Sequence, residues 1–208
     1  MIKVHKITNN FYDSNSYIVV KQDEFIIIDP CVNASLLTDF FINKKCLGIF
    51  LTHGHYDHFC EIESFEFEKY FLYMHKEAVS KIYDLEKNYG KFFNAKKTLN
   101  IKKEKIKVIE EGKAKISKFE IEIIETPGHS SCCLCFKIEK SLFTGDTLFK
   151  ESIGRTDLFS SNSKEMKKSL YRLTNLPKNL IVYPGHEENT TLANELINNV
   201  FIRKSDKR

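Results

Sequence analysis

Residues 51–59, LTHGHYDHF, place three histidines and one aspartate within the six positions 53–58. The whole chain has only seven histidines, so almost half of them lie in this short stretch. Neutral imidazole is the commonest protein ligand for borderline metals. Buried polar groups gathered so closely would stay partly unsatisfied unless they coordinate something. The stretch therefore predicts a metal site, provided that the rest of the chain supplies further ligands.

Three later motifs supply such residues. TPGHSS (126–131) and YPGHEE (183–188) each place a histidine directly after Pro-Gly, and FTGDTLF (143–149) places an aspartate after glycine. Each follows a β-rich run, and a glycine before the candidate ligand allows the backbone to approach closely. Four predicted strand ends thus present seven candidate metal ligands: His53, His55, Asp57, His58, His129, Asp146 and His186.

The hydrophobic pattern around these motifs predicts two sheets with helices outside them. The expected strands are two within 16–30, then 47–53, 71–75, 105–111, 118–130, 133–149 and 179–188. The expected helices are 34–45, 76–90, 163–173 and 190–201. The histidines and the aspartate of residues 53–58 would lie just past the carboxyl end of strand 47–53, where a rigid sheet positions loop residues for binding or catalysis.

The composition indicates an ordinary globular protein, with 42% hydrophobic and 29% charged residues among 208. We expect one domain over residues 1–208. The net charge of +4 is small and spread along the chain, which argues against a nucleic-acid partner. The sequence has no apolar run long enough for a membrane span and no signal-peptide layout. We therefore expect a cytoplasmic protein without a membrane partner.

The six cysteines are not expected to form disulfides, because a chain of this length does not need such cross-links. The three in SSCCLCF (130–136) are expected to be small buried apolar residues and not ligands. Cys60, two residues after His58, is likewise expected to have a structural role and not to be a ligand. His5 and His75 match none of the motifs and are expected to be unrelated to the metal site.

Seven ligands are too many for one zinc, which takes three or four, but they suit two metals that share a bridging carboxylate. THGHYDH resembles the HxHxDH signature of the metallo-β-lactamase-fold superfamily, and TPGHS, GDTLF and YPGH follow in that superfamily's order. The resemblance implies an α+β fold, a four-layer αββα sandwich with the metal site at one edge of its two sheets. It also implies one metal at His53, His55 and His129, a second at Asp57, His58 and His186, and Asp146 as the bridge.

GDTLFKESIGRTDLF (145–159) is similar to the glyoxalase II (hydroxyacylglutathione hydrolase) group, here in a short, single-domain form. That similarity implies hydrolysis of a thioester such as S-lactoylglutathione by a hydroxide shared between two divalent metals. Zinc is the expected metal, with iron or manganese as alternatives. Asp57 and Asp146 would be catalytic, with Asp57 also orienting the hydroxide. Arg155 would contact the glutathione part of the substrate; the competing interpretation is an exposed ion pair with Asp157.

Other functions stay open at this point. GRTD (154–157) is also similar to persulfide dioxygenases, in which a single iron would use His53, His129 or His55, and Asp146. A nuclease of the same superfamily is disfavoured by the lack of a concentrated basic face, and a non-catalytic protein by the intact ligand set. Glu61 and Glu187 stand where the family pattern commonly has glycine; neither removes a ligand, and both bear on the shape of the substrate pocket.

Overall fold

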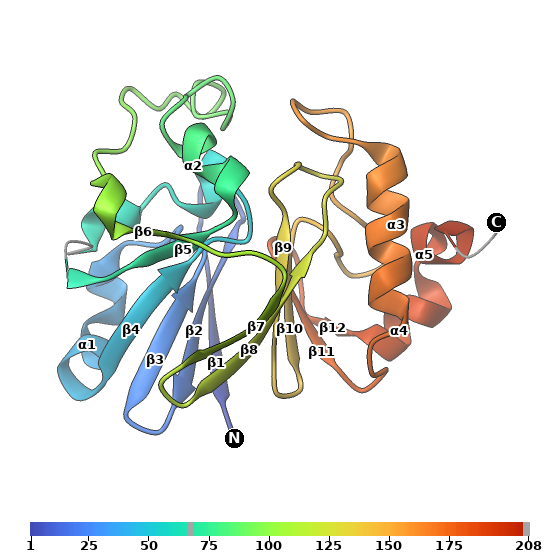
Figure 1. The fold of residues 1–208 in the computed structure, drawn as a ribbon, viewed down its shortest axis with the longest axis horizontal. Helices are drawn as coiled ribbons and strands as arrows, with labels where there is room; N and C mark the ends of the chain where they lie inside the picture. Colours follow the sequence, from blue (N-terminus) through green and yellow to red (C-terminus); the bar gives the residue numbers. More distant parts are fainter. Residues whose placement is uncertain (66–68, 206–208) are drawn as a thin grey trace.

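The computed structural model describes residues 1–65 and 69–205 as two six-stranded sheets packed face to face, with helices on both outer faces (Figure 1). This arrangement confirms the predicted α+β sandwich of four layers. Among the described residues, no helix has the length and the apolar character that a membrane crossing needs.

The first sheet holds its strands in sequence order, antiparallel from β1 to β3 and parallel from β3 to β6. Three helical segments pack on its outer face. The strands are β1 (Lys3–Thr8), β2 (Asn15–Lys21), β3 (Glu24–Ile28), β4 (Lys45–Phe50), β5 (Leu72–Met74) and β6 (Ile106–Val108). The helical segments are η1 (Ala34–Leu37), α1 (Thr38–Asn43) and α2 (Lys76–Ile82).

The second sheet has the order β12-β11-β10-β9-β8-β7, in which only β10 and β11 pair in parallel. Its strands are β7 (Gly112–Ile116), β8 (Phe119–Glu125), β9 (Leu134–Ile138), β10 (Ser141–Gly145), β11 (Ile181–Pro184) and β12 (Thr190–Thr191). Its outer face is covered by α3 (Ser163–Thr174), α4 (Leu192–Asn198) and α5 (Val200–Ser205). Short 3-10 helices lie at η2 (Tyr56–His58), η3 (Ile62–Ser64) and η5 (Lys103–Lys105).

The core has three apolar layers, which strand alternation explains. On β2, Tyr17 and Val19 point between the sheets, whereas Ile18 and Val20 point outward to α1 and α2. A register shift of one residue would exchange these two sets, so burial on both faces fixes the pairing. A third layer lies between the second sheet and helices α3 to α5. The sheets are thereby held rigidly against each other, and their strand ends keep fixed positions.

All six cysteines are free, as expected. Cys132 packs in the layer beneath α2, while Cys135 packs in the layer beneath α3. Although these two cysteines have the spacing of a CxxC pair, their side chains pack in different apolar layers, on the outer faces of different sheets. Cys60 is partly buried, and its thiol lies 3.6 Å from the carbonyl oxygen of Cys31.

Two predicted helices end differently in the structure. The helix expected over 76–90 stops at Ile82, because the amide of Asn88 turns back and donates to the carbonyl oxygen of Lys81 at 3.0 Å. The helix expected over 190–201 is instead β12 and two helices separated at Asn199. The sequence reading also missed β1 and β7, whose exposed lysines hide the alternation of an edge strand.

Candidate metal centre

The seven predicted ligands converge at one edge of the sandwich. They lie on the loops that follow the carboxyl ends of β4, β8, β10 and β11. Their ligand atoms form three groups, each within 4.8 Å: His53, His55 and His129; His53, His58 and Asp146; and Asp57, His58 and His186. Residues separated by more than 130 positions are thus brought into one cluster, which we call the histidine cluster.

Asp146 lies between two of these groups, His53, His55 and His129 on one side and Asp57, His58 and His186 on the other, which we call the two outer groups. Its Oδ1 atom is 3.3 Å from Nε2 of His58, and its Oδ2 atom is 3.4 Å from Nε2 of His129 and 3.6 Å from Nε2 of His186. A carboxylate in this position can offer one oxygen to each of two cations.

Several buried atoms of the cluster make no hydrogen bond of good geometry within the protein. Among the described residues these are Nε2 of His53, His55 and His58 and Oδ1 of Asp146, although the last two of these atoms lie 3.3 Å apart. A buried polar atom left in this state costs roughly 1–3 kcal/mol. Imidazole nitrogens and a carboxylate are suitable ligands for zinc and iron, so the cluster fits divalent metals chemically as well as in its spacing.

Burial keeps two of the rings neutral. It lowers the pKa of His55 to about 3, with a further contribution from His129, and it holds the pKa of His53 well below its ordinary value. A neutral imidazole keeps the lone pair that a metal needs.

The carboxylates produce the opposite effect at His58. Burial alone would lower the pKa of His58, but Asp146 and Asp57 outweigh it and raise that pKa well above the ordinary value. Burial would likewise raise the pKa of Asp146, yet the charges of His186 and His58 hold it well below the usual range. The cluster therefore has anionic oxygens at its centre at neutral pH.

Asp29, at the end of β3, is a residue of the site that the sequence analysis missed. Its Oδ2 atom accepts a hydrogen bond from Nδ1 of His58 at 3.0 Å and one from the hydroxyl of Thr52 at 2.7 Å. That hydroxyl is itself 3.1 Å from Nδ1 of His53. Asp29 thus orients two rings of the cluster, as carboxylates beside metal-binding histidines commonly do. The sequence contains an indication of this residue, because an aspartate directly follows the apolar run that forms β3 (Glu24–Ile28).

Backbone carbonyls orient two further rings. Nδ1 of His129 donates to the carbonyl oxygen of Arg155 at 2.9 Å, and Nδ1 of His186 donates to that of Asp13 at 3.0 Å. These bonds turn Nε2 of each ring toward the centre of the cluster, where Nε2 of His129 lies 2.9 Å from Nδ1 of His55 and Nε2 of His186 lies 3.2 Å from Oδ2 of Asp57.

Two glycines allow these loops to close on Asp146. A Cβ atom at Gly185 would lie 2.2 Å from Oδ1 of Asp146, and one at Gly154 would lie 1.9 Å from its carbonyl oxygen. Any larger residue at either position would push the loop away. The glycine preceding His186 therefore has the role that the sequence predicted for it.

A cavity of about 620 Å³ opens onto the cluster. His55, Asp57, His129, Asp146 and His186 form its floor. Its walls carry mostly aromatic and aliphatic side chains: Tyr89, Phe92, Phe93, Phe149, Ile153 and Leu158. A concave, largely apolar pocket with a few convergent polar groups is typical of a substrate site.

Two charged residues lie at the rim of this cavity. Arg155 lines it, and its guanidinium makes a bidentate pair with Asp157, with contacts of 2.7 and 2.8 Å. Glu187 also lines it and has a φ angle of 65°. That left-handed conformation favours glycine, so the glutamate stands at a position whose backbone suits the residue common in the family pattern.

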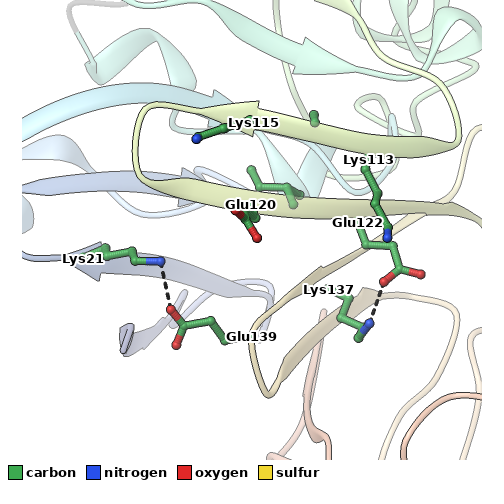
Figure 2. Close-up of a pocket in the computed structure, with 9 residues that line it drawn as sticks. Lys21, Lys113, Lys115, Glu120, Glu122, Lys137 and Glu139 are labelled. Carbon is green, nitrogen blue, oxygen red and sulfur yellow. Dashed lines mark hydrogen bonds and ion pairs between the residues drawn. The ribbon is translucent and has the colours of Figure 1, made fainter.

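Another hollow of the same volume lies at the opposite end of the sheets (Figure 2). Its lysines and glutamates largely neutralise one another. Lys21 is 3.0 Å from Glu139, and Lys137 is 2.5 Å from Glu122. Exposed pairs of this kind contribute little energy, and the lining has no histidine or cysteine. The chemistry thus belongs to the cavity above the histidine cluster.

The two remaining histidines lie outside the cluster, as predicted. The ring of His5 contacts Phe40 edge-on, and His75 caps the start of α2 by accepting from the backbone N–H of Glu77 at 3.2 Å.

The chain matches known proteins over most of its length. A probable metallo-hydrolase of Streptococcus pyogenes is 29% identical over 210 residues, with 97% of this chain and 90% of that one covered. The hydroxyacylglutathione hydrolase of Prochlorococcus marinus is 29% identical over 184 residues, which cover 84% of this chain and 65% of that one. The chain thus spans about two thirds of that hydrolase.

Solved structures share the fold. The BLEG-1 B3 metallo-beta-lactamase superimposes with a TM-score of 0.87 at 27% identity, covering 97% of this chain and 99% of that one. TTHA1623 in a di-iron-bound form gives a TM-score of 0.81 at 29% identity, covering 95% and 100%. The family description of the metallo-beta-lactamase superfamily matches residues 9–186. The chain is therefore a member of the metallo-beta-lactamase superfamily and a metal-dependent hydrolase of that group.

Proposed function

We propose that this protein hydrolyses thioesters with two divalent metals held in the histidine cluster. The observation that carries the proposal is the convergence of five histidines and two aspartates in one cluster, of which three histidines and both aspartates line a cavity of about 620 Å³. Hydrolysis at such a site needs no nucleophilic side chain from the protein.

The grouping of ligand atoms suggests how the residues divide between the metals. His53, His55 and His129 would hold one metal, and Asp57, His58 and His186 the other. Asp146, close to histidines of both groups, would bridge them. When bound, such cations supply Lewis acidity, since they lower the pKa of water and stabilise negative charge that develops on a carbonyl oxygen. A relative whose structure holds two irons supports the count of two.

Asp57 would also act on the attacking water. It is buried beside His58 and His186, whose charges outweigh burial and lower its pKa, so its carboxylate is ionised at neutral pH. The hydroxyl of Ser14 fixes the backbone of Asp57 by donating to its carbonyl oxygen at 2.8 Å. A carboxylate held in this way can accept a proton from water and orient its lone pair. The remaining walls of the cavity exclude bulk water and bind the substrate.

The thioester assignment draws support from relatives named hydroxyacylglutathione hydrolase, at 29% and 30% identity. Thioesters suit the site for a chemical reason as well. A thiolate is a good leaving group that needs no general acid, because a thiol is far more acidic than an alcohol or an amine.

Hydrolysis of β-lactams is a second candidate, favoured by the likeness to the BLEG-1 enzyme at 27% identity. The persulfide dioxygenase stays an alternative prediction. The three activities consume different substrates, so one set of assays separates them.

The test uses purified protein loaded with zinc, iron or manganese in turn. We expect turnover of S-lactoylglutathione or of the acetyl thioester of N-acetylcysteamine, little hydrolysis of a chromogenic cephalosporin and no oxygen uptake with glutathione persulfide. Asp146→Ala should abolish turnover, while His5→Ala, on β1 and outside the cluster, should retain it. Cephalosporin turnover without thioester turnover would favour the second candidate, and full activity of Asp146→Ala would contradict the bridging assignment.

A further inference from the structure

The walls of the cavity carry a chemical signature of their own. Tyr89 packs edge-on against His55, with ring centroids 5.2 Å apart, and Phe149 packs edge-on against His186 at 5.9 Å. Aromatic rings thus stand directly beside both outer groups of the histidine cluster. A substrate whose scissile bond lies at the cluster must pass between them.

The aromatic wall extends outward to the mouth. Phe92 is 79% exposed although it lines the cavity, and its ring contacts that of Phe93 at 5.2 Å. Phe93 in turn packs against Tyr12 and Tyr56. Phe92 and Phe93 thus extend the apolar lining of the cavity toward solvent, and a contiguous apolar surface of this kind, unlike a single exposed side chain, marks a binding surface.

The loop that presents this wall is held in place at a cost. Tyr89 has a φ angle of 62°, which is unusual for a bulky residue. The hydroxyl of Tyr89 accepts a hydrogen bond from the backbone N–H of Phe159. The carbonyl oxygen of the preceding residue, Asn88, accepts one from the backbone N–H of Tyr56 at 2.8 Å. Strained residues that their surroundings hold so firmly tend to occur at functional sites.

The charges at the rim do not favour an anionic ligand. The guanidinium of Arg155 is engaged by Asp157, and both side chains are about two-thirds exposed. The side chain of Glu187 is exposed, and the Nζ atom of Lys6 donates to the backbone carbonyl oxygen of the same residue at 2.6 Å. The two cations at the rim, Arg155 and Lys6, thus each lie beside an acidic residue, and neither is left unpaired for an anionic ligand.

From these observations we infer that the preferred substrate is an uncharged thioester with an apolar group, about the size of an aromatic ring, beside the scissile bond. This inference rests on the proposed thioesterase function and narrows its substrate class. The aromatic walls would bind the apolar group by burial, and Glu187 would disfavour conjugates that carry carboxylates, such as those of glutathione.

Four thioesters test it with the metal-loaded protein. The small neutral probe is the acetyl thioester of N-acetylcysteamine, and the aryl probes are its phenylacetyl counterpart and benzyl thioacetate. S-Lactoylglutathione is the anionic probe. We expect kcat/KM for the better aryl probe to exceed that for the small probe by roughly tenfold or more, as expected for burying one ring. The anionic probe should be the poorest.

Variants assign the effect to the wall and to the rim. Phe92→Ala should reduce the ratio of aryl to small-probe kcat/KM several-fold, while Phe11→Ala, an exposed aromatic that does not line the cavity, should leave the ratio unchanged. Glu187→Gln should raise kcat/KM for S-lactoylglutathione relative to that for the neutral probes.

The outcomes are distinguishable. Turnover of the small probe without an aryl preference would overturn this inference and leave the thioesterase proposal intact. A preference for S-lactoylglutathione that Arg155→Ala removes would also overturn it, because the arginine would then serve an anionic substrate. No turnover of any thioester would overturn both proposals.

Discussion

The imidazole of His58 is joined to the carboxylate of Asp29 by a hydrogen bond of 3.0 Å from Nδ1 to Oδ2, and both side chains are buried. Asp29 ends β3 and His58 follows β4, so the parallel pairing of these two strands creates the contact. Through Thr52, the same carboxylate also reaches His53. Asp29, which is not itself a candidate ligand, therefore orients two residues that are.

Asp29→Asn should weaken metal binding by roughly 10- to 100-fold, the usual effect of removing a carboxylate that orients a metal-binding histidine. The amide keeps the shape of the side chain but loses its charge and one acceptor. Competition with a chromogenic chelator measures the change. Asp39→Asn, in the first turn of α1 and remote from the cluster, is the control; equal affinity in both variants would show that Asp29 does not support the site.

Metal binding should release protons. The pKa of His58 is raised well above 6.5 by Asp146 and Asp57, despite burial, so chelator-treated protein binds a proton there at neutral pH. A metal and this proton compete for Nε2, and metal affinity must therefore fall as the pH falls. Calorimetric titration in two buffers of different ionisation enthalpy measures the released protons. Identical heats in both buffers would contradict the raised pKa.

The same titration has a consequence for stability. Because the folded pKa of His58 lies above the unfolded value, its protonation stabilises the metal-free fold fully below about pH 6.5. This contribution is lost as the pH rises through the raised folded value. Denaturant unfolding of chelator-treated protein across that range should show it, and the His58→Gln variant should lack it.

The candidate ligands could be predicted from the sequence, because metal-binding residues occur at characteristic short spacings. HxHxDH and the two Pro-Gly-His motifs identify their candidate ligands without any knowledge of the fold. Asp29 follows a predicted strand, but its role depends on the pairing of β3 with β4, which the sequence pattern does not show. The end of α2 was equally hidden, because it is set by the side chain of Asn88, six residues beyond Ile82. The pattern of apolar residues thus contains no information about long-range strand pairing or about side chains that end a helix.

Glu187→Gly should stabilise the fold by about 1 kcal/mol, because a non-glycine residue pays that much for a left-handed φ angle. The observed angle is 65°. Chemical denaturation of metal-free protein gives the difference in the free energy of unfolding. Glu188→Gly serves as the control: its φ is not positive, and it loses an ion pair with Lys150. If both variants are destabilised alike, the backbone at Glu187 is unstrained.

Lys81→Met should destabilise the protein by roughly 2 kcal/mol, as expected for hydrogen bonds from a charged donor. The buried Nζ atom of Lys81 donates to the hydroxyls of Ser130 at 2.6 Å and Ser160 at 2.7 Å. It thereby ties α2 to the loop of His129 and to the segment that follows Arg155. Thermal unfolding measures the loss. Lys76→Met, at an exposed position of the same helix, should change stability by no more than about 0.5 kcal/mol.

The amount of metal that activity requires tests the dinuclear hydrolase most directly. Chelator-treated protein is titrated with zinc, and separately with iron and manganese, while hydrolysis of the acetyl thioester of N-acetylcysteamine is followed. We predict that activity rises until two equivalents per chain are bound, because the cluster supplies two outer groups of ligands with Asp146 between them. Full activity at one equivalent, with no further metal bound, would contradict the dinuclear site.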